Sequence, residues 1–358
     1  MITKVNHLVS IIVLIITFLI PSIILASDNV LATQKKLNEL GFNAGAADGI
    51  WGNTTKNALI KYLSTKGLKF DGSLDNNEFE LLEIKNIRNE KLPFRYNIDK
   101  SLHKSWVSEF KNIMEILQEV LPVEENFRFF GVNKDVKNSA MDIYAWNSKV
   151  KNPFSEKPNM GGASISGDGR TKWMVLEINK DEFKYHSPHR YSVIVHEYFH
   201  IYQIGLSKDR LDTKWLAEGG AKVMEEMFVQ QYYGKSSLER DLKNRSFWSD
   251  KVFTDPNLYE KYETSGGNMD MNYAGSAFML LTLVKELQKD NISEQEAFKL
   301  VFRDFWLEKA RQGNWKKAFE KTFNMSVKTF YERLSEYNRN DVRKILPSKS
   351  LKIQDIFD

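Results

Sequence analysis

The sequence predicts an α+β protein with two folded units, and three observations lead to this class. The chain has 358 residues, more than one ordinary hydrophobic core accommodates. Segments with strand character occupy its middle, whereas almost everything after Ser187 has a helical pattern. Residues 28–84 contain three short helical segments, and so short a stretch buries too little surface for an enzyme core. It is therefore expected to be a separate small module.

Composition narrows the class of protein. Hydrophobic residues make up 42% of the chain and charged residues 27%, as in ordinary globular domains. The formal net charge of +4 is a mild excess that favours contact with an anionic cell envelope. No basic cluster is interleaved with aromatic residues, so nucleic acid is not expected as a partner. The absence of cysteine excludes disulfide bonds and thiolate metal ligands.

Residues 1–27 have the pattern of an export signal. Lys4 supplies a positive start, an almost unbroken apolar run extends from Leu8 to Leu25, and Ala26-Ser27 offers small residues for cleavage. The run is long for a signal peptide, so an uncleaved membrane anchor is the alternative, and it would be the chain's only membrane contact. Both interpretations place the remaining chain outside the cytoplasm, in the periplasm or cell wall, secreted or anchored.

The small module has a simple helical pattern. A first helix that ends near Gly41 is followed by a turn at Ala47–Gly52, a second helix at Thr54–Thr65 and a third at Asn76–Leu82. The residues that match a family pattern in spacing are Leu40-Gly41-Phe42, Asp48-Gly49, Gly52, Thr55, Ala58, Leu59 and Tyr62.

On these residues the module resembles the peptidoglycan-binding domains of wall-acting enzymes. Leu63 departs from the family pattern, in which Gln often follows the aromatic residue. Individually, most of the matching residues are explained by the fold, since glycine suits turns and leucine and tyrosine suit a core. The resemblance of the module as a whole implies that it binds peptidoglycan or another envelope polymer.

The rest of the chain is expected to hold one larger domain. Residues 85–100 are charged and lack periodicity, which predicts a linker, and the domain is placed at 101–345 with a tail at 346–358. Its predicted early elements are an amphipathic helix at Ser101–Leu121 and strands at Phe127–Val132, Ala140–Trp146 and Lys172–Ile178.

The motif His196-Glu197-Tyr198-Phe199-His200 predicts a metal site. Residues four apart lie on one face of a helix, so both imidazoles can reach a single ion. Glu197 then lies beside the metal, where its carboxylate can accept a proton from bound water. Ser187 and Pro188 suit the start of such a helix.

A catalytic zinc ion needs a third protein ligand and an open position for water. Without cysteine, this ligand is His, Asp or Glu, and Glu218 offers a carboxylate on the next predicted helix. Glu225, on the same helix face, is the alternative ligand or a partner of a ligand, and Glu226 is a weaker candidate. His186 and His189 are expected to be surface or supporting groups.

The segment Trp215–Ala221 is similar to the Trp-Leu-x-Glu-Gly-x-Ala motif of gluzincins, a group of thermolysin-like and aminopeptidase-like zinc metallopeptidases. The resemblance implies that Glu218 is the third zinc ligand, with one Zn²⁺ per chain. It also implies a thermolysin-like α+β catalytic domain with a helical C-terminal part. The motif that ends at Gln203 and the pattern at 315–330 are similar to the peptidase-MA-like group, although Asn324 stands where glycine is common.

Two further features each have a functional and a structural interpretation. Tyr273 opens a predicted helix and is the candidate that stabilises the oxyanion, as a Tyr or His does in gluzincins; the alternative is a packing role. Gly161-Gly162-Ala163 precedes the strand at 172–178 and is a candidate substrate-binding edge strand; the alternative is an ordinary glycine-rich turn.

These observations predict an exported zinc-dependent peptidase that hydrolyses amide bonds by a zinc-activated water and is retained at the cell wall. Its substrate is either a peptide of peptidoglycan or an envelope protein, and the sequence does not separate the two. A third possibility is an inactive wall-binding protein with a residual zinc site. Glu197 counts against this, because a structural zinc site has no use for a neighbouring base.

Overall fold

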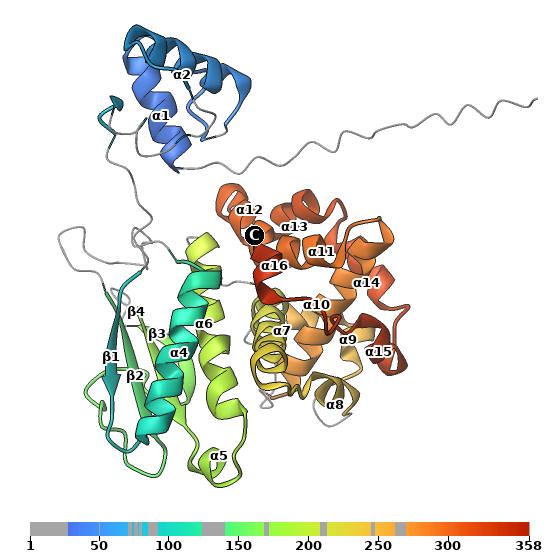
Figure 1. Ribbon diagram of the computed structural model, residues 1–358. Coiled ribbons are helices and arrows are strands. Elements are labelled where there is room, and N and C mark those ends of the chain that lie inside the picture. The colour runs from blue at the N-terminus through green and yellow to red at the C-terminus, as the bar shows by residue number, and fades with distance from the viewer. Residues whose placement is uncertain are drawn as a thin grey trace, which may run out of the picture. The chain divides into compact units, whose positions relative to one another are not determined.

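The computed structural model describes residues 28–49, 51–70, 74, 78, 81–84, 92–123, 140–167, 172–207, 213–244, 248–261 and 270–357. The chain forms two compact units, and the boundary between them follows Arg88 (Figure 1). The predicted export signal, the strand predicted at 127–132 and most of the helix predicted at 76–82 lie outside the described residues.

The first unit is built on two helices, α1 (Asp28–Glu39) and α2 (Asn53–Thr65). Buried Gln34 fixes the turn between them, because its Nε2 donates to Asp48 Oδ1 and to Thr55 Oγ1, both at 3.0 Å. Its Oε1 accepts the Gly49 amide at 2.8 Å, and Gly49 has φ +74°, a backbone conformation that favours glycine. The small core comprises Leu37, Ala44, Ala58, Leu59, Tyr62, Leu63 and Leu82.

The second unit contains a mixed sheet whose described strands follow the order β1-β2-β4-β3. The strands β1, β2 and β4 are parallel, and β3 pairs antiparallel with β4 at the edge. Helices α4 and α6 lie along one face, where alternate residues of β2 and β4 enter the main core (Figure 1). Their bounds are β1 Phe94–Ile98, α4 Lys104–Val120, β2 Met141–Asn147, β3 Ala163–Gly167, β4 Lys172–Ile178, α5 Lys180–Lys184 and α6 His189–Ser207.

The described residues that follow α6 are largely helical, as predicted. Helix α7 packs between α6 and α10, and the later helices lie around α7 and α10 (Figure 1). Their bounds are α7 Lys214–Tyr233, α8 Leu238–Lys243, α9 Lys251–Thr254, η1 Pro256–Tyr259, α10 Asp270–Lys289, α11 Glu294–Lys299, η2 Leu300–Asp304, α12 Phe305–Gln312, α13 Trp315–Phe323, α14 Val327–Leu334, η3 Arg339–Asp341, α15 Val342–Ile345 and α16 Ile353–Phe357. The α+β class is thereby confirmed.

Two boundaries predicted from the sequence differ from the structure. Residues 94–98, placed in the linker 85–100, form β1, which pairs with β2; Arg95 also contacts Asp142 at 3.0 Å. Residues 353–357, placed in the tail 346–358, form α16, whose Ile353 and Ile356 are buried. Each segment has only five residues and lies among charged residues, so its hydrophobic pattern is too short to predict a strand or a helix. The helix predicted from residue 101 begins at Lys104, after the capping residue His103.

Two glycines allow close packing of α7. A Cβ atom on Gly219 would lie 2.4 Å from the backbone oxygen of Ser276 in α10. A Cβ atom on Gly220 would lie 2.9 Å from Gln203 Nε2 and 3.1 Å from a ring carbon of Phe199, both in α6. Consecutive glycines therefore bring α7 close to both neighbours. Among the helices that the structure describes, none is sufficiently long and apolar to span a bilayer.

Candidate metal centre

The histidine motif lies in the middle of α6, a largely buried helix. The helix begins as the sequence predicts, with the Ser187 hydroxyl accepting the His189 amide at 3.2 Å. From Ser192 to Gln203 every residue of α6 is buried. His196 and His200 are each 7% exposed and Glu197 is 5% exposed, so the motif is almost entirely removed from solvent. Buried polar side chains require partners, and α7 supplies carboxylates to both imidazoles.

Three side-chain atoms converge from α6 and α7. The Nε2 atoms of His196 and His200 are 3.2 Å apart, and Glu218 Oε2 lies 3.3 Å from the first and 3.4 Å from the second. A tetrahedral zinc ion with bonds of about 2.0–2.1 Å keeps its ligand atoms about 3.3–3.4 Å from one another. The triangle therefore has the dimensions that zinc requires. His196, His200 and Glu218 are also the one group of His, Asp and Glu with metal-binding geometry among the described residues.

Each imidazole is oriented by a second hydrogen bond. His196 Nδ1 lies 3.1 Å from Glu225 Oε2, and His200 Nδ1 lies 2.8 Å from Gln203 Oε1. In a neutral imidazole these oxygens accept the Nδ1 proton and leave Nε2 free to bind a metal. Of the two roles considered for Glu225, this contact fits that of a partner of His196, whereas Glu218 lies within 3.4 Å of both Nε2 atoms.

Gln203 and Lys222 also support the imidazoles, directly or through Glu225, and neither was assigned this role from the sequence. Gln203 bridges two helices, because its Nε2 also donates to the Ala217 carbonyl at 3.1 Å. Lys222 Nζ donates to Glu225 Oε1 at 2.6 Å and to Glu226 Oε1 at 2.8 Å. A signal was present in each case: Gln203 follows His200 by three residues, and Lys222 follows Glu218 by four, so both lie on the ligand-bearing helix faces.

The electrostatics of the centre in its metal-free form resemble a buried ion pair. Burial alone would lower the pKa of His196, but hydrogen bonds to Glu218 and Glu225 outweigh this effect and raise that pKa to about 10. Burial would raise the pKa of Glu218, yet His200 and His196 hold it well below its usual range. In the metal-free site His196 therefore retains a proton, at the position where the spacing of the three side-chain atoms suits a metal cation.

Glu197 differs from the other two carboxylates. Burial raises the pKa of Glu197 above its ordinary value, and the nearby His196 and His200 offset this only in part. Burial would also raise the pKa of Glu225, but Lys222 and His196 keep it below its usual range. Of these three buried carboxylates, Glu197 is the one whose pKa is raised.

Tyr273 lies near His196 of α6, and the glycine segment lies at the sheet edge. The Tyr273 ring, at the start of α10, has its centroid 5.5 Å from that of His196, and the residue is 36% exposed. Gly161 and Gly162 lead into β3, the strand at the sheet edge that also packs along α6. The Gly162 amide donates to Glu177 Oε2 at 2.9 Å, which holds the start of β3 against β4.

The remaining candidates have structural roles. His189 Nδ1 lies 3.0 Å from Glu182 Oε1, and His186 is an exposed residue with φ +52°. Glu226 accepts the Ser237 amide at 2.6 Å and the Ser236 hydroxyl at 2.8 Å, so it anchors the turn before α8 rather than a metal.

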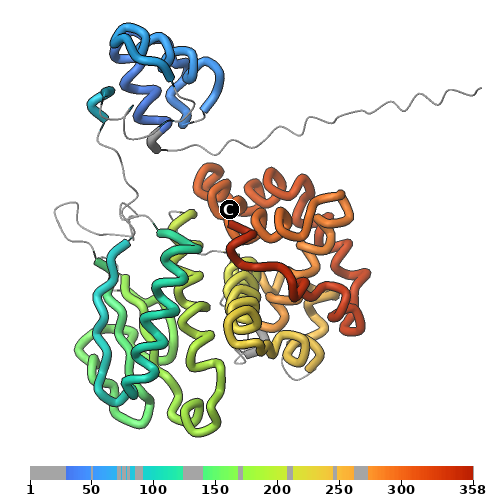
Figure 2. The backbone as a smooth tube through the Cα atoms, in the orientation of Figure 1, coloured from blue at the N-terminus to red at the C-terminus, as the bar shows by residue number. Residues whose placement is uncertain are grey.

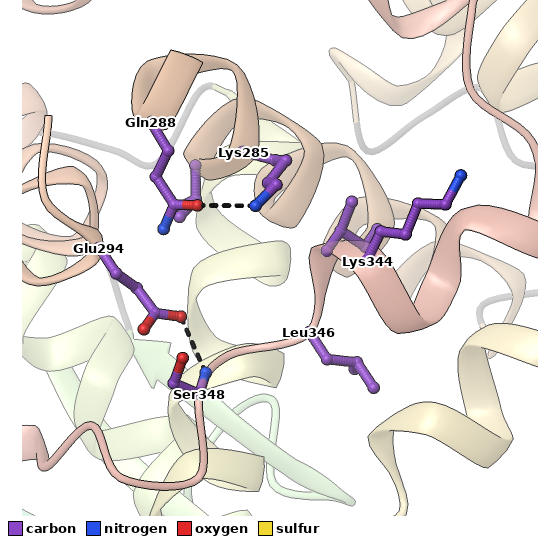
Figure 3. Close-up of a pocket in the computed structure, with 8 residues that line it drawn as sticks. Lys285, Gln288, Glu294, Lys344, Leu346 and Ser348 are labelled. Atoms are coloured by element: carbon purple, nitrogen blue, oxygen red, sulfur yellow. Dashed lines mark hydrogen bonds between the residues drawn. The ribbon is translucent and has the colours of Figure 1, made fainter. Parts of the chain in front are cut away.

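A hollow on the C-terminal helices lies apart from these residues. It is lined by Val284, Lys285, Gln288, Glu294, Lys344, Ile345, Leu346 and Ser348 (Figure 3). Lys285 donates to Gln288 at 3.1 Å, and Glu294 accepts the Ser348 amide at 2.8 Å, so its polar groups already pair with one another (Figure 3). It contains no residue of the metal centre, and we assign it no part in the chemistry.

Comparison with known proteins identifies one part of the chain. Residues 26–82 match the family described as a putative peptidoglycan binding domain. No curated protein and no solved structure matches the chain. The first unit is therefore a peptidoglycan-binding domain, which associates the chain with a peptidoglycan-type polymer of the cell envelope. For the second unit, the gluzincin assignment stays a prediction from its motifs.

Proposed function

We propose that this chain is a zinc-dependent peptidase held at the cell wall by its peptidoglycan-binding domain. One observation carries the proposal: His196, His200 and Glu218 present three ligand atoms 3.2–3.4 Å apart, on helices that are already packed. Glu197 adds a buried carboxylate of raised pKa next to His196. A purely structural zinc site has four protein ligands and no need of such a base, so the combination favours catalysis.

Zinc bound at this centre would lower the pKa of a coordinated water and polarise the carbonyl of an amide. The Glu197 carboxylate accepts the proton that the water gives up, and then donates it to the leaving nitrogen. The raised pKa of Glu197 suits both steps, because the group must take the proton and hold it until the amine departs. Glu225 and Gln203 keep the imidazole rings oriented during this exchange.

Tyr273 and β3 supply candidate substrate contacts. The Tyr273 ring is close to His196 and partly exposed, a position from which its hydroxyl can donate to the oxygen of the attacked amide as negative charge develops there. Because β3 ends the described sheet, its outer edge offers backbone groups to an extended peptide, and Gly161-Gly162-Ala163 lie where that edge begins. Such pairing suits a peptide backbone in any substrate.

The two substrate classes have different support. The peptidoglycan-binding domain raises the concentration of the enzyme at the wall, which favours the stem peptides or crosslinks of peptidoglycan. An envelope protease with the same site would use that domain only for retention. We therefore propose wall peptides first and envelope proteins as the second candidate.

A single set of samples tests the proposal. Purified full-length protein is assayed for zinc content and for cleavage of peptidoglycan and of a denatured protein, with a chelator control. We expect about one zinc per chain. The E218A variant should lose most of this zinc, whereas E197Q should keep it and lose turnover by about two to four orders of magnitude. Full hydrolysis by E197Q would exclude Glu197 as the base, and a wild-type chain that binds zinc but cleaves neither substrate would support the inactive wall-binding alternative.

A further inference from the structure

Lys222 is a buried cation between the metal centre and the neighbouring helix α8. Its side chain is only 13% exposed, and its ammonium group lies 2.6 Å from Glu225, 2.8 Å from Glu226 and 3.6 Å from Asp241. Each of these carboxylates is itself almost fully buried. Removing a lysine from water in this way costs free energy, so a role in solubility at the surface does not account for its position.

The two oxygens of Glu225 have separate partners. Oε1 accepts from Lys222, and Oε2 faces His196 Nδ1 at 3.1 Å. Because both oxygens belong to one planar group, the contact with Lys222 determines the direction in which the other oxygen points. Without that cation, Glu225 would lie beside Glu226 with one oxygen unsatisfied, and repulsion would favour its rotation away from His196.

Lys222 is in turn held from a distant segment. Glu226, its second partner, accepts the Ser237 amide at 2.6 Å and hydroxyls from Ser236 and Ser237 at 2.8 and 2.6 Å. These bonds fix the Glu226 carboxylate against the turn that precedes α8. A continuous series of hydrogen bonds therefore leads from that turn through Glu226, Lys222 and Glu225 to His196.

We propose that Lys222 is a positioning residue of the metal centre, which acts through Glu225 to hold the His196 ring with Nε2 directed at the metal. The inference rests on the proposed function, since it presupposes a metal at His196, His200 and Glu218. Lys222 touches neither metal nor substrate. Its effect is on the strength and geometry of metal binding, not on a chemical step.

The protein contains a matched control. Lys289 donates to Glu286 at 2.6 Å, the two residues are three apart on α10, and the Glu286 side chain is 2% exposed. The pair repeats the spacing, distance and buried carboxylate of Lys222 and Glu225, although Lys289 itself is 54% exposed. Glu286 contacts Arg333 and Tyr337 instead of a histidine. Loss of Lys289 therefore changes a similar ion pair without touching the metal centre.

The test measures zinc affinity by competition with a chelating dye, the visible spectrum of the cobalt(II) form, and the Tm of each metal-free variant. K222M should weaken zinc binding about 10- to 100-fold, the range found for partners of metal ligands, and should alter the cobalt spectrum. K222R should recover most of the affinity. K289M should bind zinc within about twofold of wild type. If K222M also remains within about twofold of wild type, the inference is wrong.

A double variant covers the case in which K222M folds poorly. K222M/E225Q removes both charges of this ion pair together, and Glu226 and Asp241 keep their bonds to Ser237 and Arg240. If Lys222 acts through Glu225, the double variant should bind zinc as tightly as E225Q alone, whereas a further loss would overturn the inference. A wild-type chain without zinc affinity would instead refute the proposed function, which keeps the two failures distinct.

Discussion

Replacement of Gly219 by alanine would place a methyl group against the backbone of α10. The new Cβ atom would lie 2.4 Å from the Ser276 carbonyl oxygen and 2.7 Å from its carbonyl carbon. Favourable carbon contacts begin at about 3.5 Å, so α7 and α10 must separate by about 1 Å. Backbone atoms cannot rotate away as a side chain would, and the helices must move as bodies. Gly219 adjoins the proposed ligand Glu218, so this movement should also weaken zinc binding at the proposed centre.

The magnitude follows from two opposing effects. Overpacking of a close-packed contact costs about 1–3 kcal/mol, while alanine in place of glycine favours a helix by about 1 kcal/mol. Because the clash is with backbone, the packing cost should lie in the upper part of that range, about 2–3 kcal/mol, which leaves a net loss of about 1–2 kcal/mol in the free energy of unfolding. In a domain of this size, the Tm should fall by about 2–8 °C.

Gly205 provides the matched control on α6. Among the described residues, a Cβ atom there would meet the Val123 side chain alone, at the ordinary contact distance of 3.4 Å. G205A should therefore stabilise the domain by about 0.4–1 kcal/mol. Both variants are compared with wild type by calorimetry in the presence of chelator, and then by zinc titration. A G219A protein as stable as G205A, with undiminished zinc affinity, would refute the packing argument.

Three further results are expected. Y273F should lower kcat with little change in zinc content or KM, and an unchanged kcat would return Tyr273 to a packing role. Deletion of residues 28–84 should abolish sedimentation with insoluble peptidoglycan but spare cleavage of a small soluble peptide; a truncated protein that still pellets would show that the second unit itself holds the polymer. In metal-free protein, the pKa of His196 is raised from 6.5 to about 10, so its stabilising proton is fully bound below pH 6.5 in both the folded and unfolded chain and is lost from the folded chain only as the pH approaches 10. Stability should thus decline between pH 7 and 9 by up to about 1.4 kcal/mol per pH unit, and a flat profile, or one as steep in E225Q, would contradict this assignment.

The histidines could be predicted because their relation is local. Residues four apart share a helix face whatever the tertiary structure, so the pairing of His196 with His200 needs only a helix. The carboxylate is a different matter. Glu218 and Glu225 are about 10 Å apart along α7, and which of them meets the imidazoles depends on the offset between two helices. Spacing alone left both possible, and the packed α6–α7 pair distinguishes their roles.

The missed elements have physical causes of a similar kind. In β1, Phe94, Tyr96 and Ile98 alternate with polar residues, which is a strand signal, but the strand is short and follows a charged stretch. The spacing of Lys222 from Glu225 and Glu226 allows ion pairs on a helix, but it does not show that these pairs are buried, because that depends on the turn before α8, which fixes the Glu226 carboxylate. Edge strands and buried ion pairs depend on neighbours that only the tertiary fold supplies.

The short helix α16 has a consequence for the order in which the domain is completed. The chain returns from α15 across the helical layer (Figure 2), and Phe357 packs against Tyr202 of α6 at a centroid distance of 5.8 Å. The Ile353 amide also donates to Gln231 of α7 at 2.9 Å. A growing polypeptide therefore makes every proposed zinc ligand more than a hundred residues before it makes the segment that closes over their helices. Until then Tyr202 lacks this aromatic contact, so the packing around α6 and α7 is completed only after Phe357 has been made.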